Sequence, residues 1–239
     1  MALVELVIAV DVGKRADRTA LCIVERVRPR PPETDTSKWH VDWKVPSRET
    51  LYLVRDLGRL PIGTKHTDGA FEIAKVCHDA RCYDPDGSLT FLLDATGIGE
   101  GLADLLERYL PSDVRMTKCW FTGSERVERV KGELRVGKSF VVSRLTSLLE
   151  TGRVRLGDVP QRHALVEELR DFEFRVTQGG NYTAEARSGA HDDLITALAL
   201  ATLLEGSAVP SYRPLPPSPY RSQVEDDWHA LHAAPPALW

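Results

Sequence analysis

The feature that most constrains the fold is a pair of short, strongly apolar runs that each end at an aspartate. Residues 3–10 end at Asp11, and residues 89–93 end at Asp94. The first run alternates like a β-strand, and the second has the pattern of a buried strand. In an open α/β sheet the strand ends and helix starts meet in one crevice, where ligands bind. The two carboxylates are therefore predicted to lie at one edge of a sheet.

A second pair of acids opens the last apolar stretch of the chain. Asp192 and Asp193 stand directly before residues 194–204, whose pattern predicts a helix. The helix dipole favours acids there, but a helix cap needs only one of them. Carboxylates gathered in one crevice raise each other's pKa unless a cation compensates, and hard oxygen ligands suit Mg²⁺ or Mn²⁺. The four acids predict a divalent-metal site for phosphate-ester chemistry.

Between these acids the sequence alternates between strand and helix patterns. We expect strands at 19–24, 39–45, 50–57, 114–121 and 154–156, helices at 70–82, 100–109, 140–149 and 163–170, and a hairpin from 172–176 and 181–187. Strands joined by hairpins at the front and then alternating with helices predict an α/β fold, a mixed β-sheet flanked by helices. The run of prolines after residue 205 predicts a flexible tail, so we expect one domain over 1–205 and a tail over 206–239.

Composition narrows the class of protein. The 239 residues fit one domain, and no apolar run is long enough to span a bilayer. The N-terminal residues lack the order of a signal peptide, and four cysteines do not suggest a disulfide framework. We therefore predict a cytoplasmic protein without a membrane partner.

Basic residues concentrate between positions 115 and 155, although the whole chain carries a net charge of −4. The candidates for contact with nucleic acid are Arg126, Arg129, Lys131, Arg135 and Lys138. A local cationic face beside an acidic, metal-neutralised site would suit a phosphate backbone. A solvated surface laced with Glu–Arg pairs is the alternative, and the sequence leaves both open.

Residues 132–139 satisfy the P-loop pattern G-x-x-x-x-G-K-[ST]. A P-loop needs a buried strand before it and a helix after it. The helix is expected, but residues 124–131 are charged throughout and make a poor central strand. We favour Lys138 as the start of a helix near DNA, and a P-loop nucleotide-binding module stays open as an alternative.

The order of these acids resembles the ribonuclease-H-like nuclease superfamily, and within it the nuclease domain of phage large terminase subunits. The matching motifs are residues 11–13, 93–99 and 191–201. The resemblance covers most of residues 3–205. It implies a ribonuclease-H-like mixed β-sheet and a metal-dependent endonuclease that cuts double-stranded DNA during viral DNA packaging or processing.

The resemblance also implies roles for the acids. Asp11 would bridge two Mg²⁺ or Mn²⁺ ions, Asp94 would hold one, and the pair Asp192 and Asp193 would hold the other. The adjacent acids differ by about 100° around a helix, so they need not both be ligands.

The implied partners are double-stranded or branched DNA and a separate packaging ATPase or portal, in the cytoplasm of a phage-infected bacterium. Large terminases carry an ATPase motor ahead of the nuclease, whereas Met1 lies just before the first strand here. The sequence therefore leaves open whether this chain is an excised domain or a free-standing nuclease. A Holliday-junction resolvase, which shares the fold and the acids, is a further alternative.

Overall fold

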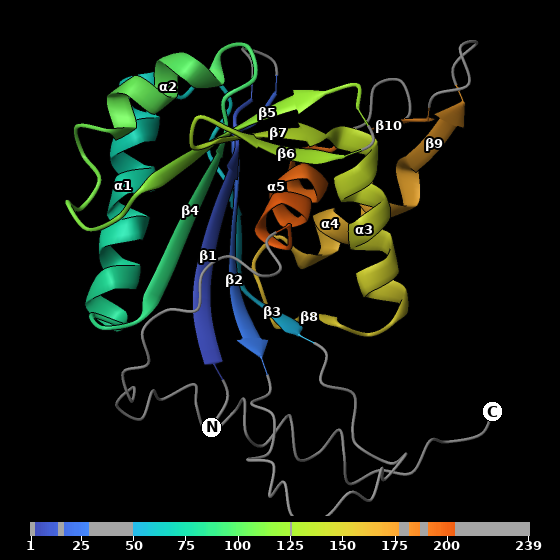
Figure 1. Ribbon diagram of the computed structural model, residues 1–239, viewed down its shortest axis with the longest axis horizontal. Helices are drawn as coiled ribbons and strands as arrows, with labels where there is room; N and C mark the ends of the chain where they lie inside the picture. The colour runs from blue at the N-terminus through green and yellow to red at the C-terminus, as the bar shows by residue number, and fades with distance from the viewer. Residues whose placement is uncertain are drawn as a thin grey trace, which may run out of the picture.

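The architecture is a mixed eight-stranded sheet with helices on both faces (Figure 1). The computed structural model describes residues 3–13, 17–28, 50–124, 126–176, 182–186 and 191–203. The strand order is β6-β7-β5-β4-β1-β2-β3-β8. The bounds are β1 (Leu3–Asp11), β2 (Ala20–Arg28), β3 (Leu51–Arg59), β4 (Ser88–Asp94), β5 (Met116–Thr122), β6 (Val127–Val130), β7 (Glu133–Gly137) and β8 (Val154–Leu156). A two-stranded hairpin follows, made of β9 (Phe172–Val176) and β10 (Tyr182–Ala186).

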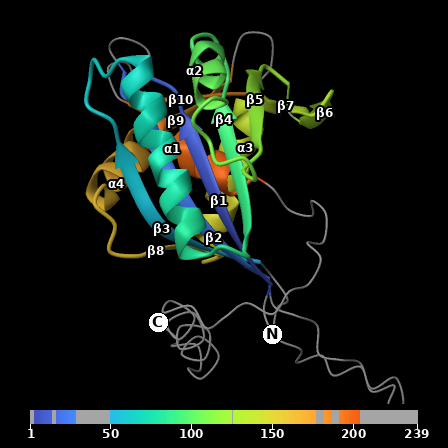
Figure 2. The same ribbon diagram turned by 90° about the vertical axis from the view of Figure 1, so that its left-hand side faces the viewer.

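Two groups of helices cover the sheet. They are α1 (His66–Tyr83) with α2 (Gly99–Leu106), and α3 (Lys138–Glu150) with α4 (Arg162–Asp171) and α5 (Asp193–Ala201). Figure 2 shows α1 and α2 in front of the sheet and the orange α5 behind it. The buried side chains accordingly form two main clusters, one on each face. The predicted mixed α/β sheet flanked by helices is confirmed.

The sheet register brings the first two acids to one edge. β1 pairs antiparallel with β2 and parallel with β4, and Val10 lies opposite Leu93. Asp11 and Asp94 are the next residues of these adjacent parallel strands. They therefore end β1 and β4 at the same level, as the sequence predicts.

Alternation along the strands decides which face these acids take. Ala9 and Leu92 belong to the core cluster that includes α3 and α5. Successive side chains of a strand point to opposite faces, so residues two positions apart share a face. Asp11 and Asp94 come two residues after Ala9 and Leu92, which directs both carboxylates toward α3 and α5.

Helix α5 is the central element on that face. Every residue from Asp193 to Ala201 is buried, and the helix packs against β1 and β2. A helix that is apolar around its whole circumference is stable only inside a core. Because α5 is enclosed in this way, the start of the helix is held at the sheet edge where β1 and β4 end.

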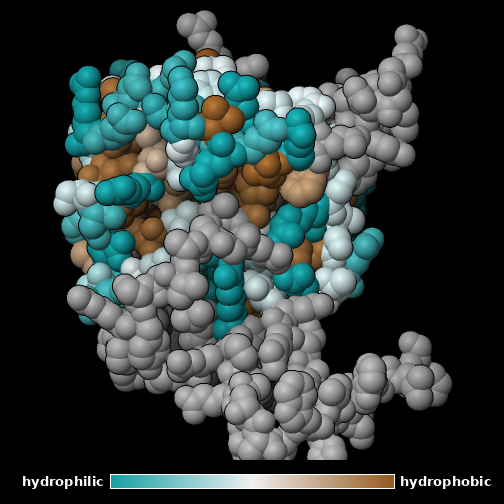
Figure 3. Space-filling view, in the orientation of Figure 1, coloured by the Kyte–Doolittle hydropathy of each residue, from teal (hydrophilic) through white to brown (hydrophobic). Residues whose placement is uncertain are grey.

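Most expected elements are present, with boundaries shifted by a few residues. Within the charged segment expected to make a poor central strand, Val127–Val130 form β6 at the sheet edge, where one side of the strand pairs with no other strand. The expected strand at 39–45 and the tail over 206–239 lie outside the described residues. Apolar residues on the face shown in Figure 3 form separate patches among polar ones. Within the described ranges, no helix is long and apolar enough to cross a membrane.

Candidate active site

Asp11 and Asp94 form a close carboxyl pair at the end of β1 and β4. Their side chains are hydrogen-bonded to each other, and Asp94 is buried. The Thr96 N–H donates to Oδ1 of Asp94 at 2.8 Å. At Gly99 a Cβ would lie only 2.0 Å from the Asp94 carbonyl oxygen, so this position accepts no larger residue without a shift. The start of α2 thus wraps tightly around Asp94.

The electrostatics of this pair are unfavourable for two negative charges. Burial and the neighbouring charge of Asp94 raise the pKa of Asp11 well above its usual range. Burial also raises the pKa of Asp94, which the two hydrogen bonds from Thr96 partly oppose. A cation beside the pair would therefore stabilise its ionised form. Such a carboxyl pair has the donor chemistry that a divalent cation prefers.

Lys138 is the cation that the fold already places there. It begins α3, and its Nζ lies 2.7 Å from Oδ2 of Asp192. Its charge lowers the pKa of both Asp11 and Asp94, and the charge of Asp192 raises the pKa of Asp11. Three acids and one lysine, distant in sequence, therefore share one electrostatic neighbourhood between the sheet edge and the starts of α3 and α5.

Asp193 faces elsewhere. Arg59, the last residue of β3, donates to Oδ1 of Asp193 at 2.5 Å and to Oδ2 at 3.0 Å. The same guanidinium bonds Glu168 of α4, and the other oxygen of Glu168 accepts the backbone N–H groups of Leu194 and Ile195 at 3.1 Å each. The group Arg59, Glu168 and Asp193, which we call the α5 clamp, ties β3 and α4 to the first turn of α5.

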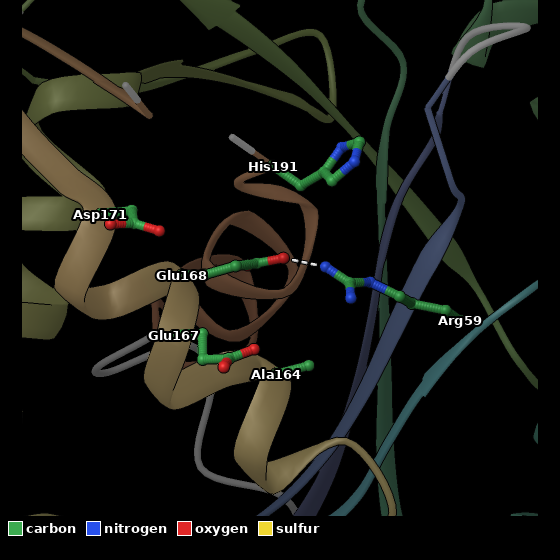
Figure 4. Close-up of a pocket in the computed structure, with 6 residues that line it drawn as sticks. All are labelled: Arg59, Ala164, Glu167, Glu168, Asp171 and His191. Atoms are coloured by element: carbon green, nitrogen blue, oxygen red, sulfur yellow. Dashed lines mark hydrogen bonds and ion pairs between the residues drawn. The ribbon is translucent and has the colours of Figure 1, made fainter. Parts of the chain in front are cut away.

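Figure 4 shows two members of the clamp, Arg59 and Glu168, at the wall of a cavity of about 200 Å³. Arg59 reaches from the sheet toward Glu168, and His191 lies above them at the turn that leads into α5. His191 Nδ1 is 4.0 Å from Oδ1 of Asp17, and both side chains are substantially exposed. Asp17 thus comes near the start of α5.

The structure separates the two adjacent acids. Asp192 points to Lys138 and the carboxyl pair, whereas both oxygens of Asp193 are taken by Arg59. As the side chains stand, no three His, Cys, Asp or Glu groups among the described residues are arranged to hold a metal ion. Asp192, the third acid near the carboxyl pair, forms an ion pair with Lys138.

The five basic candidates do not share one face. On β7, Leu134 and Val136 point into the cluster on the α3–α5 side, so Arg135 points to the opposite face. Arg129 lies directly opposite Leu134 on the paired strand, so its side chain points to the same face of the sheet as the carboxylates.

The remaining basic candidates lie around the same hairpin. Arg126 pairs with Glu128 at 2.8 Å, and Glu128 is the strand partner of Arg135. Lys131 lies in the β6–β7 turn with a φ of 51°. Of the five basic candidates, the acids' face therefore carries Arg129 and Lys138.

The P-loop alternative is not supported by the local structure. Residues 133–137, which would form the phosphate-binding loop, are strand β7, paired with β5 and β6. Their backbone groups are used in the sheet and cannot surround a phosphate. Lys138 begins a helix, as predicted, and its ammonium pairs with Asp192.

Sequence reasoning missed Arg59 and Glu168. Both lie in ordinary elements, at 109 residues' separation, and neither forms a motif with its neighbours. Glu168 stands out only because it is buried on a helix of mostly polar residues, and burial is known only from the structure.

Comparison with known proteins places this chain beside viral terminases. Residues 90–205 match the terminase RNaseH-like domain family, a match that includes Asp94, Asp192 and Asp193 and begins after Asp11. The large terminase subunits of Thermus phage G20c and Thermus virus P23-45 are each 29% identical over 119 residues. These residues are 48% of this chain and 20% of each relative, so the match spans about a fifth of their length.

Solved structures show the same fold. The large terminase nuclease of thermophilic phage G20c has a TM-score of 0.52 at 21% identity, covering 83% of this chain and 81% of that one. Its magnesium-bound form has a TM-score of 0.51 at 21% identity, with coverage of 83% and 80%. The manganese-soaked human cytomegalovirus terminase nuclease domain has a TM-score of 0.51 at 14% identity, with coverage of 83% and 81%. The expected resemblance and the ribonuclease-H-like fold are confirmed.

Proposed function

We propose, from the match of residues 90–205 to the terminase RNaseH-like domain family, that this chain is a divalent-metal-dependent endonuclease. Its substrate is DNA, and its role is the cutting of viral DNA during packaging. The nuclease domain comprises residues 1–205, and residues 206–239 are an appended tail. Double-stranded DNA and a packaging ATPase or portal are the proposed partners, in the cytoplasm of the infected host.

One observation carries this proposal: the hydrogen-bonded pair Asp11–Asp94 with Asp192 in the same electrostatic neighbourhood. Burial makes a negative charge on Asp11 and Asp94 unfavourable, and a divalent cation bound by their oxygens would compensate that charge. Asp11, Asp94 and Asp192 are the proposed ligands. Asp193 is assigned to the α5 clamp, which holds Asp192 in place.

The proposed cofactor is a pair of Mg²⁺ or Mn²⁺ ions. Asp11, Asp94 and Asp192 would hold these ions, which would supply activation of a water molecule and charge stabilisation at the scissile phosphodiester. The chain's own residues supply the rest. The carboxylates would orient the ions, and the burial of Asp94 limits the access of bulk water. Arg129 places a positive charge on the same face of the sheet, where it can contact the DNA backbone.

The test is cleavage of linear duplex, plasmid and four-way-junction DNA with Mg²⁺, Mn²⁺ or EDTA. We expect metal-dependent cutting of the duplex substrates, which falls to background in Asp94→Asn. Asparagine keeps the acceptor for the Thr96 N–H but removes the charge. Asp104→Asn is the matched control, since that exposed acid lies on α2 away from the pair.

Two results would contradict the proposal. One is a folded wild-type protein that cuts none of the substrates with either metal. The other is cutting that survives in Asp94→Asn at the level of Asp104→Asn. A strong preference for the four-way junction would transfer the assignment to a resolvase of the same fold.

A further inference from the structure

Lys138 has an unusual position for a residue at a proposed metal site. Its Nζ is 2.7 Å from Asp192, and it acts electrostatically on Asp11 and Asp94 as well. The lysine side chain is 34% exposed and that of Asp192 is 26% exposed, so the pair lies at the mouth of the site. The ammonium therefore has room to leave Asp192 toward solvent.

The backbone that carries Lys138 is held rigidly, unlike its side chain. A Cβ on the preceding Gly137 would lie 1.8 Å from the carbonyl oxygen of Ser124, and the Gly137 N–H donates to the Arg126 carbonyl at 3.0 Å. The lysine Cα is consequently fixed at the sheet edge. Its four-methylene stem can swing the ammonium over several ångströms while the fold stays unchanged.

Charge balance indicates what displaces the ammonium. Asp11, Asp94 and Asp192 would carry three negative charges when ionised, and Lys138 supplies one positive charge. At a given distance a divalent cation attracts a carboxylate twice as strongly as an ammonium does. The ammonium holds Oδ2 of Asp192, and this oxygen becomes available to a metal when Lys138 leaves.

We propose that Lys138 is an exchangeable counterion that occupies Asp192 in the metal-free site and is released by metal binding to contact a DNA phosphate. This inference rests on the proposed nuclease function. It makes Lys138 a residue that couples metal binding to DNA binding. In the metal-free chain the ammonium is paired with Asp192, and in the metal-loaded chain it is available to the substrate.

Coupling of this kind has a measurable signature. Each lysine that neutralises a phosphate adds roughly one unit to the slope of log affinity against log salt. Lys138 should contribute to that slope only when metal is bound. By reciprocity, a site that has lost the competing ammonium should bind metal more tightly.

The experiment measures Mn²⁺ binding by calorimetry to the full chain without DNA, in wild type, Lys138→Met and Lys138→Arg. We expect Lys138→Met to bind Mn²⁺ about tenfold more tightly, from the loss of one nearby positive charge. Lys138→Arg keeps the charge and should bind near the wild-type level. Lys118→Met is the matched control, because Lys118 also pairs with acids, namely Asp104 of α2 and Glu107 just after α2.

The second readout is the affinity for a duplex with a non-hydrolysable backbone, measured across salt concentrations. In EDTA, wild type and Lys138→Met should show the same salt slope. In Mn²⁺, the salt slope of wild type should be steeper than that of Lys138→Met by about one. Equal Mn²⁺ affinity in wild type and Lys138→Met, weaker binding in the variant, or a slope difference already present in EDTA would overturn the inference. Absence of Mn²⁺ binding to folded wild type would instead refute the proposed function itself.

Discussion

Replacing Arg59 with methionine tests whether the α5 clamp holds the start of α5 in place. The side chains of Arg59, Glu168 and Asp193 are 10%, 6% and 7% exposed, so all three charges are buried together. Methionine keeps most of the length of arginine and removes the charge. The variant would leave two buried carboxylates facing each other without a cation.

The magnitude follows from that burial. Removing one partner of a buried ion pair typically costs about 3–5 kcal/mol, because the remaining charge stays uncompensated. For a domain of this size, such a loss lowers the melting temperature by roughly 6–20 °C. Arg126→Met is the control, since Arg126 pairs with Glu128 at 2.8 Å but is 76% exposed. An exposed pair contributes about 0–1 kcal/mol.

The assay is denaturant unfolding of both variants in EDTA, with the midpoint and slope recorded for each. A loss in Arg59→Met no larger than that in Arg126→Met would refute the reasoning that burial makes the clamp matter. Mn²⁺ affinity also reports whether Asp192 keeps its position at the start of α5. We expect Arg59→Met to weaken Mn²⁺ affinity as well, because the clamp is adjacent to Asp192, whereas Arg126→Met should leave it unchanged.

Two further predictions concern the acids and the basic hairpin. In EDTA, Asp11→Asn should be more stable than wild type at pH 7 and no more stable below about pH 3.8. The pKa of Asp11 is raised in the folded state, so the folded wild type loses stability as pH rises through that pKa. Thermal unfolding across pH measures the difference between the two proteins. A stability gain of Asp11→Asn that does not depend on pH would contradict the reasoning. Arg129→Ala should weaken binding to duplex DNA about tenfold or less, as expected for one phosphate contact, whereas Arg135→Ala on the opposite face should change it little. Fluorescence anisotropy at fixed salt compares the two, and equal losses would count against a DNA path along the acids' face.

Local sequence patterns determined most of the architecture. The apolar runs that end at Asp11 and Asp94 could be identified as strands because side-chain alternation and chain polarity are local properties. The same holds for the apolar stretch that becomes α5 and for Lys138 at the start of α3. The charged segment that contains β6 makes a poor central strand, and β6 is indeed an edge strand; which strand takes the edge depends on the whole sheet.

Only the tertiary structure shows that Asp192 and Asp193 have different partners. Both acids satisfy the same motif, and the sequence leaves them equivalent. The difference depends on Arg59, 134 residues from Asp193, and on Lys138, 54 residues from Asp192. Which carboxylate meets which cation is fixed by the packing of β3 and α3 around α5. Partnerships between such distant residues leave no local pattern, because they arise from the burial of whole elements against one another.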